Sequence, residues 1–442
     1  MAVNKSFRPI HYLGSKIKIL DFINEIVDEL DATKGQVCDL FSGSGSVSRH
    51  LSLTRPVVSV DIQEYSHVIC NAMLNLIQYT NSDNFIHKCK TSDYYNNLIL
   101  SINPIIKYEE KCIKQSLDGN SEPLCEFLEK GSLIKLEKTG HIECSKDLKI
   151  ALLTSLDALR KNNLNNKSLI SKYFGCLYFS YYQAACLDSI LNELGKGEDK
   201  DKYLLLASLL STASDVVNTV GNQFAQPIQA RKSDGTPKVN IGNRVSKDRS
   251  KDIFNIYSLW LQKYINLEKS NFKHTVIKDD FLMALDSLDE TTKVVYADPP
   301  YTRDHYSRFY HVLETICLND YPEISTTKIK GNVDLSRALY RSERHQSPFC
   351  IKSQASDAFD NMFNKISKIK ASLVLSYSPF DENTKSTPRV MTIDKIKELG
   401  SKYFNNISIR HPGTFMHSKF TTKEKSFDKV IDGEILIVFK ND

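Results

Sequence analysis

The sequence predicts an α/β fold in which a mixed sheet is interrupted by a long, largely helical insert. Short β-branched runs alternate with helical patterns over residues 36–80, and the alternation resumes after residue 273. Helical patterns dominate between them, and the chain of 442 residues exceeds one typical domain. We therefore expect a sheet domain formed by residues 1–94 and 273–442, and a helical domain formed by residues 95–272.

The composition is typical of a soluble globular protein. Apolar residues make up 41% of the chain, and the net charge of +5 says little about partners by itself. No apolar stretch approaches the roughly 18 residues of a membrane span, and the opening residues lack a signal peptide's apolar core. The ten cysteines contain no CxxC pair, so zinc-site spacing is absent. We expect a cytoplasmic protein with reduced thiols and no metal.

The first motif precedes a helix. Residues 8–16 read RPIHYLGSK, and apolar side chains then recur at helical spacing from Ile17 to Leu30. The Gly-Ser-Lys sequence offers backbone N–H groups and a cation to an anionic or carboxylate ligand. A loop with a solvated lysine is the alternative.

The second motif joins a strand to a helix. Residues 36–41 form a strand pattern, followed by the glycine-bearing loop SGSGS and a helical segment. Glycines let the backbone turn tightly and approach a ligand closely. Asp39 could receive an ammonium group there. The next strand ends at Asp61, 16 residues after Gly45, where a carboxylate can hold a ribose diol. This unit is expected to bind an adenosine-containing ligand.

The insert contains an aromatic cluster and a basic stretch. The cluster at residues 173–182 is expected to be core, with base stacking as the alternative. Residues 231–251 hold seven bases against two acids, together with Gly and Pro, so we expect a loop there. Such a loop suits a phosphate backbone, although a solvated flexible loop would look the same. A second basic stretch spans residues 328–345.

The remaining sheet elements follow the insert. A buried strand pattern at residues 294–297 runs directly into Asp298-Pro299-Pro300-Tyr301, where the prolines end the strand. Ligands bind at the carboxyl ends of such strands, although Asp298 could also be an ordinary turn residue. Further strands are expected at residues 275–278, 373–378, 407–410 and 434–439, and helices at 64–79, 307–318 and 392–399. The last two strands could form an antiparallel hairpin.

Together, these motifs resemble the alpha-class DNA adenine-N6 methyltransferases. Residues 8–16 resemble the N-terminal cofactor motif, residues 39–45 the FxGxG motif, and Asp298-Pro299-Pro300-Tyr301 the catalytic DPPY tetrad. Tyr12 stands where tryptophan is common, and Ser15 where glycine is frequent. The resemblance implies a class I methyltransferase-type (Rossmann-like) fold, with the insert as a target-recognition domain.

The resemblance also implies the ligands. S-adenosylmethionine would be the methyl donor and adenine in double-stranded DNA the acceptor. The implied cofactor-binding residues are Tyr12, Lys16, Asp39, Phe41, Gly43, Gly45, Asp61, Asp280 and Phe281. The expected DNA-facing residues are Arg231, Lys232, Lys238, Arg244, Lys247, Arg249, Arg303, His305, Arg341 and Arg344. Helix capping and packing are alternative roles for Arg303 and His305.

The resemblance assigns chemical roles to the tetrad. Asp298 and the Pro299 carbonyl would accept the two N6–H groups of an extruded adenine, while Tyr301 stacks on the base. A cytosine-C5 enzyme would need a Pro-Cys nucleophile, which does not occur. A methyltransferase for cytosine N4, RNA adenine or protein glutamine stays open, as does a DNA-binding regulator with an inactive fold. We expect a monomer, and a cognate restriction endonuclease is a partner that this family allows.

Overall fold

The computed structural model describes residues 7–303, 305–329, 332–378, 389–412 and 434–441. Residues 1–6, which bear on the expectation that no signal peptide is present, lie outside the described residues. Within the described residues the chain divides into two compact units. The first contains residues 1–76, 267–307 and 345–442, and the second contains residues 77–266 and 308–344. This division differs from the expected boundaries, because residues 77–94 and 308–344 join the helical unit and residues 267–272 join the sheet unit.

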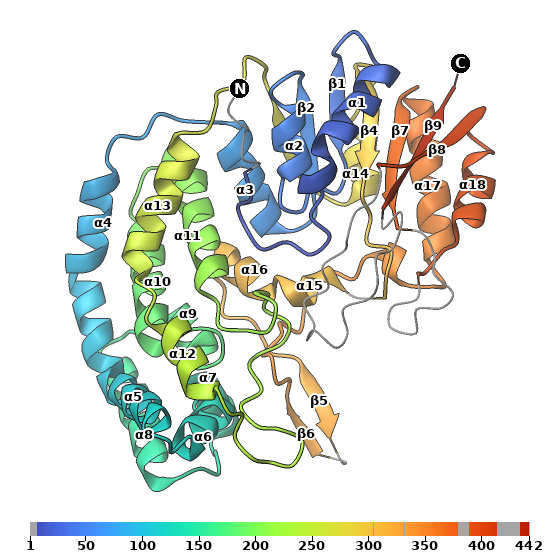
Figure 1. Ribbon diagram of the computed structural model, residues 1–442. Helices are drawn as coiled ribbons and strands as arrows, with labels where there is room; N and C mark the ends of the chain where they lie inside the picture. The colour runs from blue at the N-terminus through green and yellow to red at the C-terminus, as the bar shows by residue number, and fades with distance from the viewer. Residues whose placement is uncertain (1–6, 304, 330–331, 379–388, 413–433, 442) are drawn as a thin grey trace. The chain divides into compact units, whose positions relative to one another are not determined.

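The first unit is built on a seven-stranded mixed sheet (Figure 1). Its order is β3 (Thr275–Lys278), β2 (Val57–Asp61), β1 (Gln36–Asp39), β4 (Thr292–Ala297), β7 (Ser372–Tyr377), β9 (Ile435–Lys440) and β8 (Asn406–Arg410). The first five strands are parallel, and β9 runs antiparallel to both of its neighbours. The Rossmann-like mixed sheet and the antiparallel pairing of the last two strands are therefore as predicted.

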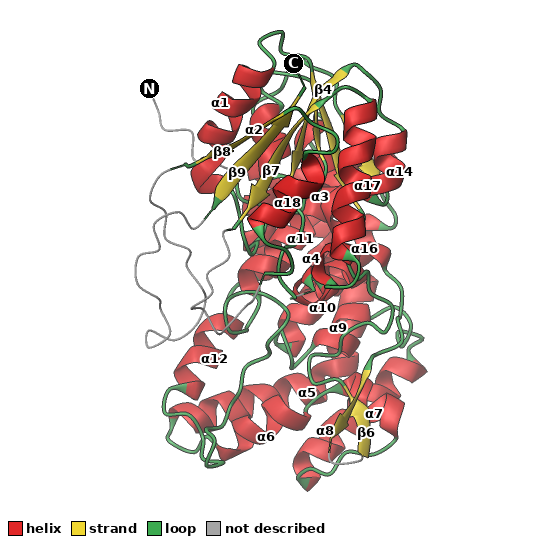
Figure 2. Ribbon diagram, turned by 90° about the vertical axis from the view of Figure 1, so that its right-hand side faces the viewer, coloured by secondary structure: helices red, strands yellow, loops and turns green. Residues whose placement is uncertain are grey.

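Alternating side chains bury both faces of this sheet. Val37, Val57 and Val294 pack with α1 (Leu20–Leu30) and α2 (Ser46–Leu51), whereas the next residue of each strand faces the opposite core. Figure 2 shows α1 and α17 (Ala355–Lys368) on opposite sides of the sheet. The other helical segments of this unit are η1 (Ile17–Ile19), α3 (Glu64–Leu74), α14 (Phe281–Asp286), η3 (Pro348–Cys350) and α18 (Ile393–Gly400). Helix α15 (Tyr306–Phe309) crosses the boundary between the units.

The strand order creates a site for ligands. The chain moves outward from β1 to β2 and β3, then returns to place β4 on the other side of β1. The loops that follow β1 and β4 therefore diverge at the same edge of the sheet. Asp39 and Asp298 lie at this switch point, one at the carboxyl end of each strand.

The second unit is mainly helical. Its helices are α4 (Ser82–Thr91), α5 (Asp93–Leu117), α6 (Glu122–Lys130), α7 (Leu133–Thr139), α8 (Lys146–Lys161), α9 (Leu169–Phe174), α10 (Tyr181–Leu194), η2 (Asp199–Asp201), α11 (Lys202–Val216), α12 (Ile241–Arg249), α13 (Ile253–Ile265) and α16 (His311–Leu318). A two-stranded sheet joins β5 (Thr326–Ile329) to β6 (Asn332–Leu335). The aromatic cluster belongs to the core, since all its rings are buried except that of Tyr182, which is 48% exposed.

Two sequence-based expectations need correction here. Residues 241–249 form α12 rather than a loop, because Ile241 and Val245 lie one turn apart and are both buried. The helix expected at residues 64–79 ends earlier, at Leu74.

No helix among the described residues has the length and apolar character of a membrane span.

Residues 308–344 are bound into the helical unit by specific contacts. The Phe224 N–H donates to the Phe309 carbonyl over 3.1 Å. The Tyr340 hydroxyl donates to the Ala225 carbonyl over 2.7 Å, and the Tyr178 hydroxyl donates to the Ala338 carbonyl over 2.9 Å. This segment is therefore a second part of the helical unit's core, contributed from later in the chain.

Candidate active site

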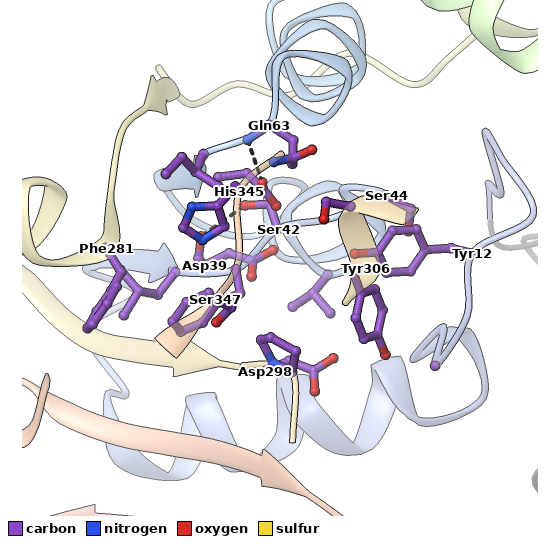
Figure 3. A pocket seen from close by; sticks show the side chains of 18 of the residues that line it. Tyr12, Asp39, Ser42, Ser44, Gln63, Phe281, Asp298, Tyr306, His345 and Ser347 are labelled. Atoms are coloured by element: carbon purple, nitrogen blue, oxygen red, sulfur yellow. Dashed lines mark hydrogen bonds between the residues drawn. The ribbon is translucent and has the colours of Figure 1, made fainter. Parts of the chain in front are cut away.

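A pocket opens at the carboxyl ends of β1, β2 and β4 (Figure 3). Its walls come from the N-terminal loop, the loops after these strands and after β3, and residues 345–350. The sequence-predicted residues that line it are Tyr12, Lys16, Asp39, Phe41, Asp61, Asp280, Phe281, Asp298, Pro300 and His305. Gly43, Gly45, Pro299 and Tyr301 lie beside these residues in the chain but do not line the pocket wall.

The glycine loop fits closely between its neighbours. Gly43 and Gly45 have φ values of 53° and 71°, in the region that disfavours other residues. A Cβ atom on Gly43 would lie 2.4 Å from the Tyr12 hydroxyl oxygen. The Gly43 N–H donates to Asp61 Oδ2 over 2.9 Å. The two glycines therefore let the loop after β1 meet both the N-terminal loop and the end of β2.

Asp61 is fixed by backbone donors. Its Oδ1 accepts from the Gln63 N–H over 2.9 Å, while Oδ2 accepts from Gly43. Burial raises the pKa of Asp61, although these hydrogen bonds act in the opposite direction. Each oxygen retains a lone pair, so the carboxylate can accept further hydrogen bonds from a diol in the pocket.

Asp39 is held against the start of α2. Its Oδ2 accepts from the Ser48 N–H over 3.0 Å and from the Ser48 hydroxyl over 2.6 Å. Burial raises its pKa to about 7, and the negative charges of Asp298 and Asp61 act in the same direction. Because the three carboxylates repel one another, this part of the pocket favours a cationic ligand.

Lys16 and Asp298 form an ion pair inside the pocket. Lys16 Nζ lies 2.7 Å from Asp298 Oδ2 and donates to the Gly14 carbonyl over 3.1 Å. The lysine side chain is 6% exposed, so the alternative of a solvated lysine is wrong. Burial raises the pKa of Asp298, and Lys16 offsets part of that increase. Asp298 is therefore not an ordinary turn residue, because its carboxylate lies in the pocket wall with a buried cation beside it.

The Tyr301 ring has a different environment. Its centroid is 5.2 Å from that of Tyr377, and the Arg389 guanidinium lies over it at 4.9 Å. Arg389 also donates to the Ser378 hydroxyl. Sequence reasoning missed this arginine, which lies 88 residues after the tyrosine. The base-stacking role of Tyr301 remains a prediction from the family resemblance.

Tyr306 and His345 also line the pocket, although the motifs did not assign them to the cofactor site. The rings of Tyr12 and Tyr306 lie 5.9 Å apart, and His345 enters the wall near Asp61. Burial lowers the pKa of His345, whereas the nearby carboxylates of Asp280 and Asp61 raise it. His345 had been noted only as part of a basic stretch. Its position in the pocket follows from the return of the chain after residue 344.

Some of the expected DNA-facing residues already have protein partners. Arg249 is buried and paired with Glu109, so the expectation that it faces DNA is corrected. Arg231 contacts Glu122 and Glu129.

The other arginines and lysines that were expected to face DNA differ in exposure. Arg341 is buried and bonds Asp320 through two nitrogens, which leaves little of its charge for DNA. Arg344 is half-buried, with its guanidinium 5.0 Å from the Tyr340 ring. Arg244 is exposed but donates to the Thr219 carbonyl. Lys232, Lys238, Lys247 and Arg303 are exposed as well.

No group of His, Cys, Asp and Glu side chains among the described residues is arranged to hold a metal ion.

Ser15 and Ser307 show another feature of the pocket. Their hydroxyl oxygens are buried in its wall and have no hydrogen-bond partner within the described part of the chain. Buried hydroxyls of this kind normally have partners, so the wall suits a ligand with polar groups.

Known proteins are similar to this chain over most of its length. Modification methylase LlaI of Lactococcus lactis subsp. lactis is 22% identical over 91% of this chain and 53% of its own length. Type II methyltransferase M.FokI of Planomicrobium okeanokoites is 23% identical over 80% of this chain and 43% of its own length. Type II methyltransferase M.CviAII of Paramecium bursaria Chlorella virus 1 is 24% identical over 84% of this chain and 83% of its own length. The chain thus spans about half the length of the first two relatives.

A family profile gives the broader match. The profile described as D12 class N6 adenine-specific DNA methyltransferase matches residues 12–111 and 223–375, more than half of the chain. These ranges include the N-terminal lysine, both glycines, Asp61 and the whole tetrad. The chain belongs to the D12 class of N6 adenine-specific DNA methyltransferases, as its motifs predict.

Proposed function

We propose that this protein transfers a methyl group from S-adenosylmethionine to N6 of an adenine in double-stranded DNA, at a specific site. The observation that carries the proposal is the position of Asp298. It lies at the switch point of the sheet, at the end of β4, in a pocket whose other carboxylates suit a cationic adenosine-containing donor.

The pocket residues fit this donor. Asp61 would accept from a ribose diol, and Asp39 would receive an ammonium group, while their hydrogen bonds to Gly43 and Ser48 hold the two carboxylates in position. The buried hydroxyls of Ser15 and Ser307 can bond its polar groups. When bound, S-adenosylmethionine supplies an electrophilic methyl group on a positively charged sulfur.

The tetrad prepares the acceptor nitrogen. Adenine N6 is a poor nucleophile because its lone pair is delocalised into the ring. Lys16 engages Asp298 Oδ2, so Oδ1 is available to accept one N6–H. The Pro299 carbonyl would accept the other, and the two bonds favour a tetrahedral nitrogen.

As the N–CH3 bond forms and the S–CH3 bond breaks, the nitrogen becomes positively charged. The carboxylate of Asp298 stabilises that charge and can take the proton. Positioning of the two reactants then supplies most of the rate enhancement.

The base must leave the duplex before this can happen. Extrusion costs a few kcal/mol, and stacking on an aromatic ring such as Tyr301 returns about 1–3 kcal/mol. We assign target recognition to the helical unit, where Lys232, Lys238 and Lys247 are exposed for phosphate contact. Because two relatives are named type II methyltransferases, we propose a cognate restriction endonuclease as the partner of this protein. We also propose that the methyltransferase acts as a monomer.

The test is methyl transfer followed by nucleoside analysis. Duplex DNA is incubated with the protein and radiolabelled S-adenosylmethionine, then digested to nucleosides. We expect the label in N6-methyladenine. Label in N4-methylcytosine, in RNA alone or in protein would refute the proposal.

The matching variant is Asp298→Ala. It should reduce transfer by at least about 100-fold, because the proton acceptor is lost, while DNA binding remains. Full transfer by this variant would show that the catalytic assignment is incorrect. An inactive wild type that still binds DNA would instead favour a DNA-binding regulator.

A further inference from the structure

Glu434 lies next to the Lys16–Asp298 pair, although it comes 136 residues after the aspartate in the sequence. It immediately precedes β9, and its side chain is 5% exposed. Its Oε1 is 3.4 Å from Lys16 Nζ. The hydroxyl of Ser376, on the neighbouring strand β7, donates to the same oxygen over 2.7 Å. A second buried carboxylate is thus fixed beside the only cation that contacts Asp298 within the described residues.

One ammonium group serves two carboxylates, Asp298 at 2.7 Å and Glu434 at 3.4 Å. Burial lowers the pKa of Lys16, but the two carboxylates outweigh that effect and hold it well above its usual value. Lys16 therefore remains charged, and its attraction is divided between two partners.

This division has a consequence for catalysis. With Asp298 as its only partner, a buried ammonium would withdraw electron density from the carboxylate that has to accept an N6–H. Glu434 and the Gly14 carbonyl give Lys16 other acceptors. Lys16 can then orient Asp298 without neutralising it.

We propose that Glu434 is a positioning residue for methyl transfer, which shares Lys16 with Asp298 and keeps Asp298 available as a proton acceptor. This inference rests on the proposed function. The competing explanation is structural, in which Glu434 only links β7 to β9 through Ser376.

The pH dependence separates these two explanations. The titratable groups that act on Asp298 or are acted on by it are Lys16, Glu434, Asp39, Tyr296, Tyr301 and Tyr306. Burial raises the pKa of Asp298 and Lys16 lowers it, while Glu434 raises it again. Removing the charge of Glu434 should therefore lower the pKa of Asp298. Loss of the strand link alone, with the charge of Glu434 kept, would have no such effect.

The experiment compares wild type with Glu434→Gln over pH 5–9. The amide retains an oxygen for the Ser376 hydroxyl, so the fold should be preserved, and a urea unfolding curve checks this. We expect kcat to fall about tenfold, because the reacting groups are less well placed, with KM for DNA little changed. The acid limb of the kcat/KM profile should move to lower pH by about one unit.

Two further variants sharpen the result. Glu434→Asp restores the charge and should recover the wild-type acid limb. Ser376→Ala loosens Glu434 without removing its charge, so it should lower kcat with a smaller shift in pH. The matched control is Glu398→Gln, which removes an exposed carboxylate on α18 in the same unit and should leave the activity unchanged.

The inference is overturned if the Glu434→Gln profile superimposes on that of the wild type, or if its lower kcat reflects only a smaller folded fraction. Either result leaves the proposed function intact, provided that wild type methylates DNA. A wild type that transfers no methyl group to adenine in DNA would refute the proposed function itself.

Discussion

Replacing Arg249 with methionine tests whether this residue is structural or contacts DNA. Both side chains of the Arg249–Glu109 pair are almost fully buried, at 2% and 3% exposed. Arg249 also donates to the Cys176 carbonyl, and the Tyr181 N–H donates to Glu109. Removal of the arginine would leave a buried carboxylate without its cation.

Such a loss is large. Breaking a buried ion pair by removing one partner costs about 3–5 kcal/mol. With a urea m-value of about 2–3 kcal/mol/M, the midpoint of unfolding should fall by about 1–2.5 M. The chain has one tryptophan, Trp260, which is 6% exposed and belongs to the same unit. Its fluorescence should therefore report directly on the unfolding of the helical unit.

The comparison needs two further variants. Lys247→Met changes an exposed residue on the same helix and should alter stability by less than about 0.5 kcal/mol. The double variant Arg249→Met/Glu109→Leu should recover much of the loss, because it leaves no unpaired charge. Under native conditions Arg249→Met should bind DNA within about twofold of the wild type. An unchanged urea midpoint combined with a large loss of DNA affinity would refute the reasoning.

Three other predictions concern the pocket and the basic stretch. Burial raises the pKa of Asp298 to about 6, and the reaction needs its carboxylate, so kcat/KM should fall about tenfold per pH unit below that value. A rate profile that stays flat down to pH 5 would contradict this role. Gly43→Ala should weaken binding of S-adenosylmethionine by at least about tenfold in calorimetry, because its Cβ would overlap Tyr12. Gly140→Ala, with a similar φ but open space around it, should cost only about 1–2 kcal/mol of stability and no affinity. Arg231→Ala should change DNA affinity less than about twofold at physiological salt, since two glutamates already neutralise the arginine, and a drop of tenfold or more would show that it contacts phosphate.

The sequence predicted the parts of this protein that depend on local patterns. Val57–Asp61 and Val294–Ala297 could be recognised as strands because β-branched residues dominate them and a carboxylate follows at or just after their ends. The glycine loop and the tetrad were also expected at the carboxyl ends of strands, where ligands bind, but their meeting at a switch point depends on the strand order, which the motifs did not predict.

Long-range pairings could not be predicted in the same way. A basic residue in a sequence shows its charge but not its partner, and Glu109 lies 140 residues before Arg249. Glu434 carries no motif, and it reaches Lys16 only because β9 is inserted next to β7. Tyr301 could be identified from its tetrad, whereas its contact with Arg389 depends on a loop far along the chain.

The chain passes between its two units four times, at residues 76/77, 266/267, 307/308 and 344/345. The helical unit is therefore not a single cassette. Its core is completed by residues 308–344, through the contacts of Phe309, Ala338 and Tyr340. If residues 77–266 alone were exchanged for the corresponding part of a relative, the new helices would have to pack against residues 308–344 of this chain, with which they did not evolve. A variant in which the helical unit is exchanged therefore has to carry both segments, and the eight residues from Tyr301 through Arg308 contain one of the junctions.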